Sequence, residues 1–167
     1  MFLKVIPVAA AAVLSMSAFA VEKEITVTAQ VDPIVELLSP AGDALPSDLP
    51  MQHVPGKGLS HETFVARIFT NDNKKDIQIR LQTEPKLTHT IDTTAAPIDL
   101  TVSVDGNALS TTATTLQAAN LFTGADTASK PLTFSIAQKT PGAVATPGLY
   151  RGPVRLVVTT AAAATAP

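Results

Sequence analysis

The side chains that most often bind zinc are sparse in this chain and poorly spaced for that purpose. Its three histidines are His53, His61 and His89, and it has no cysteine. Structural zinc sites draw their ligands from closely spaced pairs of Cys and His that converge on one ion. Because the histidines are scattered singly, we interpret them as solvated residues of loops or strand edges.

The carboxylates form one cluster that superficially suggests calcium. The stretch "TNDNKKD" carries Asp72, Asn73 and Asp76, but it lacks the longer loop with a central Gly and a terminal Glu that an EF-hand uses. A tight turn capped by Asp and Asn side chains explains it better. Asp99 and Asp105 are interpreted as isolated, solvated acids, and no serine lies in a nucleophile elbow. The sequence therefore predicts no catalytic residue, no metal and no cofactor.

Composition narrows the class of protein further. The 167 residues suit one domain, and 12 basic residues face 14 acidic ones, which gives no electrostatic reason to expect nucleic acid as a partner. Aromatic residues make up only 4% of the chain, so a large aromatic-lined ligand pocket is not expected. Arginines are expected on several strands, where protection of a sheet edge is a simpler role than binding of acidic glycans or a neighbouring subunit; they are Arg67, Arg80, Arg151 and Arg155.

Residues 1–20, "MFLKVIPVAAAAVLSMSAFA", have the layout of a secretory signal peptide. Lys4 supplies the positive start, an apolar run follows, and Ala18-Phe19-Ala20 is a small-x-small cleavage site. The apolar run is too short and too often interrupted for a membrane span. We expect cleavage between Ala20 and Val21, and export of the mature chain from the cytoplasm.

The next stretch, "VEKEITVTAQVDPIVELL" (residues 21–38), alternates apolar and polar side chains. Successive side chains of a strand point to opposite faces, so this pattern predicts a strand with one apolar face. Pro33 cannot donate a backbone hydrogen bond and is expected to interrupt the strand. The apolar row comprises Ile25, Val27, Ala29, Val31, Pro33, Val35 and Leu37.

The rest of the chain reads as short strands separated by turns. Alternation predicts strands in 62–70, 76–82, 98–104, 131–138 and 149–160, with the first two forming a hairpin around "NDNKK". Asp105-Gly106 is a strong signal for a two-residue hairpin turn. A long loop or pair of turns is expected over 40–58, and a short helical turn in "TLQAANLF". About seven short antiparallel strands predict an all-β, immunoglobulin-like sandwich.

Several stretches carry a resemblance to a known family. "VEKEITVTAQVDPIVELL" with "GDALP", "FTNDNKKDI", "PIDLTVSVDGNALSTTATTLQAANL" and "GLYRGPVRLVVTT" are similar to the major pilins of the colonization factor antigen I type, also called class 5 or alpha-fimbriae, which include the cable pilins. The likeness covers nearly the whole mature chain. Two departures are the run-on tail "AAAATAP" and a divergent loop over 47–59.

The resemblance implies an incomplete sandwich that lacks one strand. It implies that a periplasmic chaperone fills the gap first, that an outer-membrane usher replaces it with the N-terminal segment of the next identical subunit, and that a tip adhesin completes the surface fimbria. Residues 21–32 would be the donated segment, 33–160 the pilin domain and 161–167 a tail. The donor row would be Ile25, Val27, Ala29 and Val31, with Pro33 as its border, and the acceptor groove would be lined by Val154, Leu156 and Val158.

The sequence leaves other functions open. A self-contained secreted binding domain would alternate in the same way, with residues 21–38 pairing inside its own sheet. A tip adhesin would be expected to have a second domain and a longer chain. A secreted enzyme is the least favoured interpretation, because no constellation of catalytic residues is present.

Overall fold

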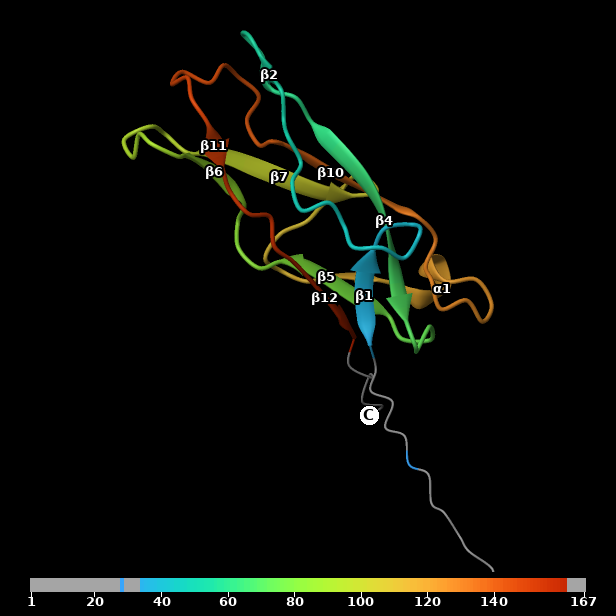
Figure 1. The fold of residues 1–167 in the computed structure, drawn as a ribbon. Coiled ribbons are helices and arrows are strands. Elements are labelled where there is room, and N and C mark those ends of the chain that lie inside the picture. The colour runs from blue at the N-terminus through green and yellow to red at the C-terminus, as the bar shows by residue number, and fades with distance from the viewer. Residues whose placement is uncertain (1–27, 29–33, 162–167) are drawn as a thin grey trace, which may run out of the picture. The chain divides into compact units, whose positions relative to one another are not determined.

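The computed structural model describes residue 28 and residues 34–161. Residues 34–161 belong to a single compact unit made of antiparallel strands (Figure 1). The predicted cleavage site at Ala20 and Val21, the predicted donor row and Pro33 lie outside the described residues. They stay predictions from the sequence.

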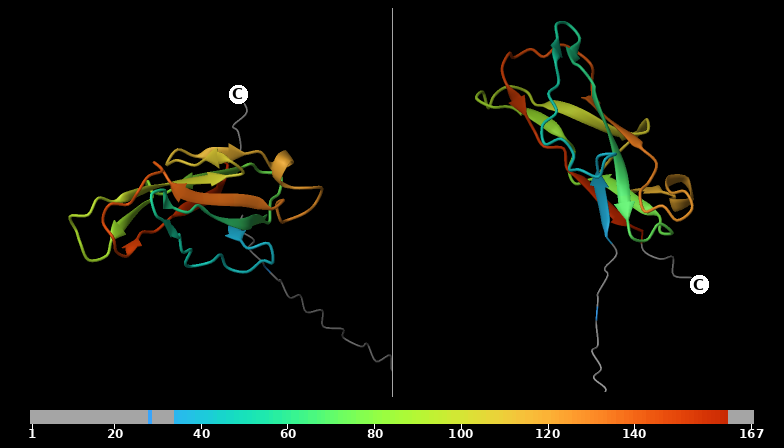
Figure 2. Two further views of the ribbon diagram at one scale, coloured as in Figure 1. Left: turned by 90° about the horizontal axis from the view of Figure 1, so that it is seen from above. Right: turned by 45° about the vertical axis from the view of Figure 1, so that its right-hand side comes forward.

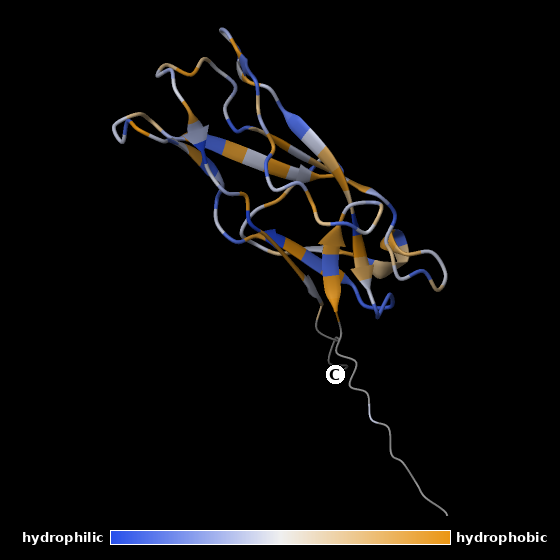
Figure 3. Ribbon diagram, viewed as in Figure 1, coloured by the Kyte–Doolittle hydropathy of each residue, from blue (hydrophilic) through white to orange (hydrophobic). Residues whose placement is uncertain are grey.

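The first sheet has the strand order β1-β4-β10-β7-β6-β11, and β8 also pairs with β7. Its strands alternate inward apolar and outward polar side chains, and Figure 3 shows this as bands of colour along β7. The bounds are β1 Val35–Leu38, β4 Glu62–Thr70, β10 Leu132–Gln138, β7 Ile98–Val104, β8 Asn107–Ala108, β6 Lys86–His89 and β11 Tyr150–Arg151.

The second sheet has the order β12-β5-β9, and a small hairpin pairs β2 with β3. One short helix, α1, follows β9, as the sequence predicts for "TLQAANLF". The described residues include no helix that is long and apolar enough to cross a membrane. The bounds are β5 Ile77–Leu81, β9 Thr114–Leu116, β12 Leu156–Thr160, β2 His53–Val54, β3 Gly58–Leu59 and α1 Ala118–Leu121.

The core lies between the two sheets, because inward side chains from both belong to one cluster. Ile68, Val102 and Phe134 come from the first sheet, and Ile77 and Ile79 from β5 of the second. Two aromatic rings in the first sheet, those of Phe64 and Phe134, stack with centroids 5.1 Å apart. The antiparallel all-β sandwich predicted from the alternation is confirmed, and Figure 2 shows it from two further directions.

The predicted hairpin between residues 62–70 and 76–82 is wrong. Both strands form, but β4 pairs with β1 and β10, whereas β5 pairs with β12 and β9. The turn at residues 71–76 therefore carries the chain from one sheet to the other. The turn residues specify that the chain reverses, and they do not specify which partners the two strands find.

The predicted hairpin at Asp105-Gly106 is confirmed. Ser103 pairs with Ala108 and Val104 with Asn107, so a two-residue turn joins β7 and β8. Asp105 and Gly106 both have positive φ angles, 45° and 81°, which matches the left-handed turn that suits the twist of a hairpin. The Asp105 carboxylate also accepts a hydrogen bond from the Thr133 N–H at 2.8 Å, which holds the turn against β10.

Candidate subunit interface at the β1 and β12 edges

The last strand, β12, is an edge strand with an apolar face. Within residues 34–161 it pairs with β5 alone, with Leu156 opposite Leu81 and Val158 opposite Ile79. Opposite residues of an antiparallel pair share a face, so Leu156 and Val158 face the core as Leu81 and Ile79 do. Unlike those two, they are only partly buried.

The backbone of β12 alternates between a bonded side and an open side. The Arg155 carbonyl accepts from the Gln82 N–H at 2.9 Å, and the Ala161 N–H donates to the Asp76 carbonyl at 2.7 Å. Because antiparallel residues alternate in this respect, odd-numbered residues direct their backbone groups at β5. The N–H and C=O groups of Leu156, Val158 and Thr160 therefore point to the side of β12 where no described strand pairs.

The first strand, β1, is the corresponding edge of the other sheet. It pairs with β4, with Val35 opposite Thr70 and Leu37 opposite Ile68. The Thr70 N–H points to the far side of β4, where it donates to the Thr127 carbonyl at 2.8 Å. By the same alternation, the backbone groups of Val35 and Leu37 point away from β4.

The two edges lie next to each other on one side of the sandwich, where β1 contacts β12 (Figure 1). The inward side chains along both edges pack against the core without being fully buried; they are Val35, Leu37, Val154, Leu156 and Val158. β12 contains no charged residue. This arrangement offers a further strand an apolar strip and a row of backbone donors and acceptors, the two requirements for strand addition.

The three residues of the predicted acceptor groove are brought together here. Leu156 and Val158 lie on β12 and face the core, and Val154 lies just before the strand and packs against the same cluster. Sequence reasoning did not single out Val35 and Leu37 as partners in this strip. Their alternation was visible, but it could not show that β1 would lie against β12.

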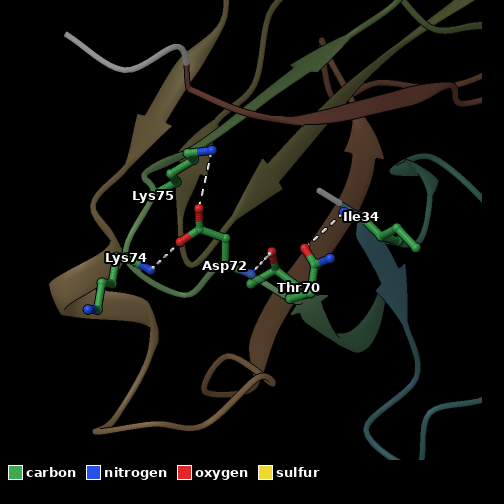
Figure 4. A network of polar contacts seen from close by, with 6 residues as sticks. Ile34, Thr70, Asp72, Lys74 and Lys75 are labelled. Atoms are coloured by element: carbon green, nitrogen blue, oxygen red, sulfur yellow. Dashed lines mark hydrogen bonds and ion pairs between the residues drawn. The ribbon is translucent and has the colours of Figure 1, made fainter. Parts of the chain in front are cut away.

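The chain enters this domain at Ile34, beside the turn at residues 71–76. The Ile34 N–H donates to Asn71 Oδ1 at 3.0 Å, and the Asp72 N–H donates to Thr70 Oγ1 at 3.1 Å (Figure 4). Lys75 Nζ lies 3.2 Å from Asp72 Oδ2. The hydrogen bond with Lys75 lowers the pKa of Asp72 below its ordinary value of 3.8, and the bond from the backbone N–H of Lys74 contributes.

The calcium-like cluster serves this turn rather than a metal. Asn73 Nδ2 donates to the carbonyls of Gly124 and Asp126, and Asp76 Oδ1 accepts from the Ala118 N–H at 2.8 Å. Across the described part of the chain, no three His, Cys, Asp or Glu side chains come together in a way that could hold a metal ion. These residues connect β4, β5 and α1.

Comparison with known proteins identifies the architecture. The profile of the family described as CS1 type fimbrial major subunit matches residues 21–159. The chain belongs to this family. The B-type fimbrial protein of CFA/I from Escherichia coli O78:H11 (strain H10407 / ETEC) is 39% identical over 151 residues, which cover 87% of this chain and 88% of the relative. The A-type fimbrial protein of CS1 from Escherichia coli is 34% identical over 152 residues, with the same coverage.

Solved structures agree. The CooA pilin from enterotoxigenic Escherichia coli superposes with a TM-score of 0.65 at 27% identity, over 75% of this chain and 86% of that one. A chain from a structure titled "Chaperone-tip adhesin complex is vital for synergistic activation of CFA/I fimbriae biogenesis" has a TM-score of 0.54 at 16% identity, over 76% of this chain and 42% of that one; this likeness shows the fold alone. The protein is a major structural component of a surface fimbria of the CFA/I type.

Proposed function

We propose that this pilin polymerises by strand donation, in which residues 21–32 of one copy fill the strip between β1 and β12 of the next. The observation that carries the proposal is the open edge of β12. It combines half-buried apolar side chains with outward backbone groups, over five residues without a charge. Such an edge invites aggregation unless another strand covers it.

The sequence of the donated segment fits this edge in register. An antiparallel match of residues 25–31 with residues 160–154 places Val27 opposite Val158, and Ala29 opposite Leu156. The donor row then shares the inward face of β12, and it meets the residues whose backbone groups point outward. The small side chain of Ala29 lies opposite the largest groove residue, Leu156. This register also matches the length of the donor row to the length of the strip.

The energy of this contact is large enough to hold a fibre together. Burial of Ile25, Val27 and Val31 contributes about 1.5–3 kcal/mol each, or roughly 5–9 kcal/mol together, before the backbone ladder is counted. Association entropy opposes part of this gain. Each contact joins two different surfaces, a leading segment and a groove, so it does not close on itself and a filament grows.

Export and assembly complete the proposal. A signal peptide over residues 1–20 is cleaved between Ala20 and Val21, and a periplasmic chaperone covers the open edge until an outer-membrane usher replaces it with the next subunit. The division into a donated segment (21–32), a pilin domain (33–160) and a tail (161–167) follows from the same scheme. Identical subunits and a tip adhesin are the remaining partners, and the pilin itself is a structural protein without catalytic activity.

Deletion of residues 21–32, followed by electron microscopy of the cell surface, tests the proposal. We expect loss of fibres while the chaperone-bound subunit still accumulates. Val27→Asp places a charge in the donor row and should abolish both fibres and the ladder of multimers on unheated SDS gels. Thr28→Asp, on the opposite face of the same segment, is the matched control and should assemble. Normal fibres from Val27→Asp would contradict the donor assignment.

A further inference from the structure

We propose a second contact at each subunit junction, which rests on the function proposed above. In it, an exposed apolar tip made by Ile91 and Leu149 at one end of a subunit docks on the hollow beside Ile34 and Phe69 of the next copy. We call the two ends the loop pole, formed by residues 89–97 and 139–149, and the entry pole, formed by Ile34 and residues 71–76.

Strand register places these poles at opposite ends of the domain. At the entry pole, Val35 pairs with Thr70 and Thr160 pairs with Ile77, on the two sides of the 71–76 turn. From there β10 runs away to Gln138, which pairs with Leu100 at the start of β7. The loops that follow β10 and precede β7 therefore share the far end, as Figure 1 shows.

The loop pole carries two of the most exposed large apolar side chains in the described chain. Ile91 is 87% exposed and Leu149 is 56% exposed. They stand on different loops, and a hydrogen bond of 2.8 Å from the Thr90 N–H to the Leu149 carbonyl joins the loops directly beside them. Two neighbouring aliphatic side chains displayed on a loop tip are unfavourable in water unless a partner covers them.

His89 fixes the geometry of this tip. Its Nδ1 atom accepts from the N–H groups of both Ile91, at 3.2 Å, and Asp92, at 2.8 Å. The proton is therefore on Nε2, which lies 3.2 Å from the Pro147 carbonyl and donates to it. Gly148 packs against the same ring so closely that a Cβ there would overlap the imidazole. The histidine thus ties both loops together and pre-organises the tip, which favours a specific contact.

The entry pole offers a receiving surface of matching character. Ile34 is 54% exposed and lines a hollow of about 300 Å³ together with Phe69 and Thr127. Lys74 is exposed on the adjoining turn, and Figure 4 shows its side chain directed away from Asp72. The loop pole contributes an acid, Asp92, beside Ile91. The charges next to the two apolar surfaces are therefore of opposite sign, which favours this pairing over contact between like poles.

The direction of the donated strand brings these two surfaces together. If it ran parallel to β12, it would end at the entry pole of the acceptor, where the acceptor's own leading segment departs toward another subunit. One pole would then have to contact two neighbours. A strand antiparallel to β12 begins at the entry pole and ends toward the loop pole, so each junction joins a loop pole to an entry pole and the chain can repeat.

The connection is too short to keep the poles apart. With Val31 as the last donated side chain, three residues lead to Ile34, which span at most about 10 Å when fully extended. Val31 would lie opposite Val154, and Leu149 lies only five positions before Val154 in the acceptor. The loop pole of one subunit must therefore lie alongside the entry pole of the next.

Cysteine crosslinking in assembled fibres tests this contact, because the chain has no cysteine of its own. The test pair is Ile91→Cys with Ile34→Cys, treated with a short bismaleimide and then heated in SDS. We expect a covalent ladder of multimers from fibres and only monomer from unassembled, chaperone-bound subunits. The control pair, Ile91→Cys with Val65→Cys, uses a 42% exposed residue in the middle of β4 and should give at least tenfold less crosslinked product.

The unheated SDS ladder separates the two proposals. Its absence from the parent chain would overturn strand donation itself. A ladder that is present in parent and variants, together with equal crosslinking by test and control pairs, would overturn the pole contact alone. Leu149→Cys with Ile34→Cys is a second test pair that should crosslink on the same grounds, and failure of both test pairs in assembled fibres would also overturn the contact.

Discussion

Strands β5 and β12 are neighbours with the same inward chemistry and different fates. On β5, the inward side chains Ile77, Ile79 and Leu81 are 0%, 0% and 1% exposed. On β12, Leu156 and Val158 lie directly opposite Leu81 and Ile79, face the same core, and stay only partly buried. β5 has a paired strand on each side, whereas β12 has one on a single side. The number of paired neighbours, rather than residue type, decides how completely an inward side chain is covered.

The other edges of the described sheets show that β12 is unusual. β9 has only three residues, two of them threonine, and β11 has two residues, one of them Arg151. Short and polar or charged edges are the ordinary protection against pairing with another chain. β12 has neither protection over five residues. An edge left unprotected in this way is consistent with a strand that is completed by another copy.

The largest expected effect comes from two identical substitutions on the closed and open sides. Because β12 ends at the entry pole, a copy of residues 21–33 joined after Thr160 by a short turn can fill its own groove. In this self-complemented chain, Val102→Ala removes a fully buried side chain and should cost about 2 kcal/mol of unfolding free energy. Val158→Ala should cost about 1–2 kcal/mol, provided that the appended strand covers it.

A double-mutant cycle sharpens that comparison. In urea unfolding, Val158→Ala combined with Val27→Ala in the appended strand should show a coupling energy of about 0.5–1 kcal/mol, since the two side chains are in contact in the proposed register. Val102→Ala combined with the same change should be additive. Additivity in both cycles would mean that the donor strand does not contact β12 as proposed.

A smaller effect is expected at the entry pole, where the open side begins. Asn71→Ala removes the acceptor for the Ile34 N–H, and we expect a loss of about 0.5–1 kcal/mol in the unfolding free energy of the self-complemented chain. Asn71→Asp keeps an oxygen acceptor and should restore most of the loss. Equal losses from both variants would show that this hydrogen bond does not hold the start of β1.

The smallest effect concerns acid pH at the turn between the two sheets. The pKa of Asp72 is lowered in the fold, chiefly by its hydrogen bond with Lys75. The group therefore contributes stability that is present above its ordinary pKa of 3.8 and is lost as the pH falls through the lower value in the fold. Asp72→Asn should reduce the fall in melting temperature between about pH 5 and about pH 2.5. An unchanged fall would show that this pair does not stabilise the turn.

The sequence predicts most strands well because their local pattern and their burial agree. Residues 62–70 and 98–104 form strands with the predicted bounds, and Asp105-Gly106 forms the predicted turn. Alternation needs only one buried face to be visible. It therefore also predicts correctly which side of the last strand faces the core, including Leu156 and Val158.

Pairing between distant strands was not predictable from the same pattern. The β4–β5 hairpin is wrong because a tight turn looks the same whether it joins neighbours in a sheet or crosses between sheets. His89 was interpreted as a solvated histidine, yet its ring holds two loops that are far apart in sequence. The candidate interface was half predictable: the apolar face of β12 was evident, but the position of β1 beside it depends on long-range register with β4.

The most direct test of strand donation is an intermolecular disulfide in fibres that carry Val27→Cys and Val158→Cys. In the proposed register these residues form a hydrogen-bonded antiparallel pair, whose Cα separation of about 5.5 Å suits a disulfide. After mild oxidation and heating in SDS without reductant, we predict a ladder of covalent multimers that collapses to monomer on reduction. A disulfide that forms only within single chains, leaving every molecule monomeric, would contradict the account.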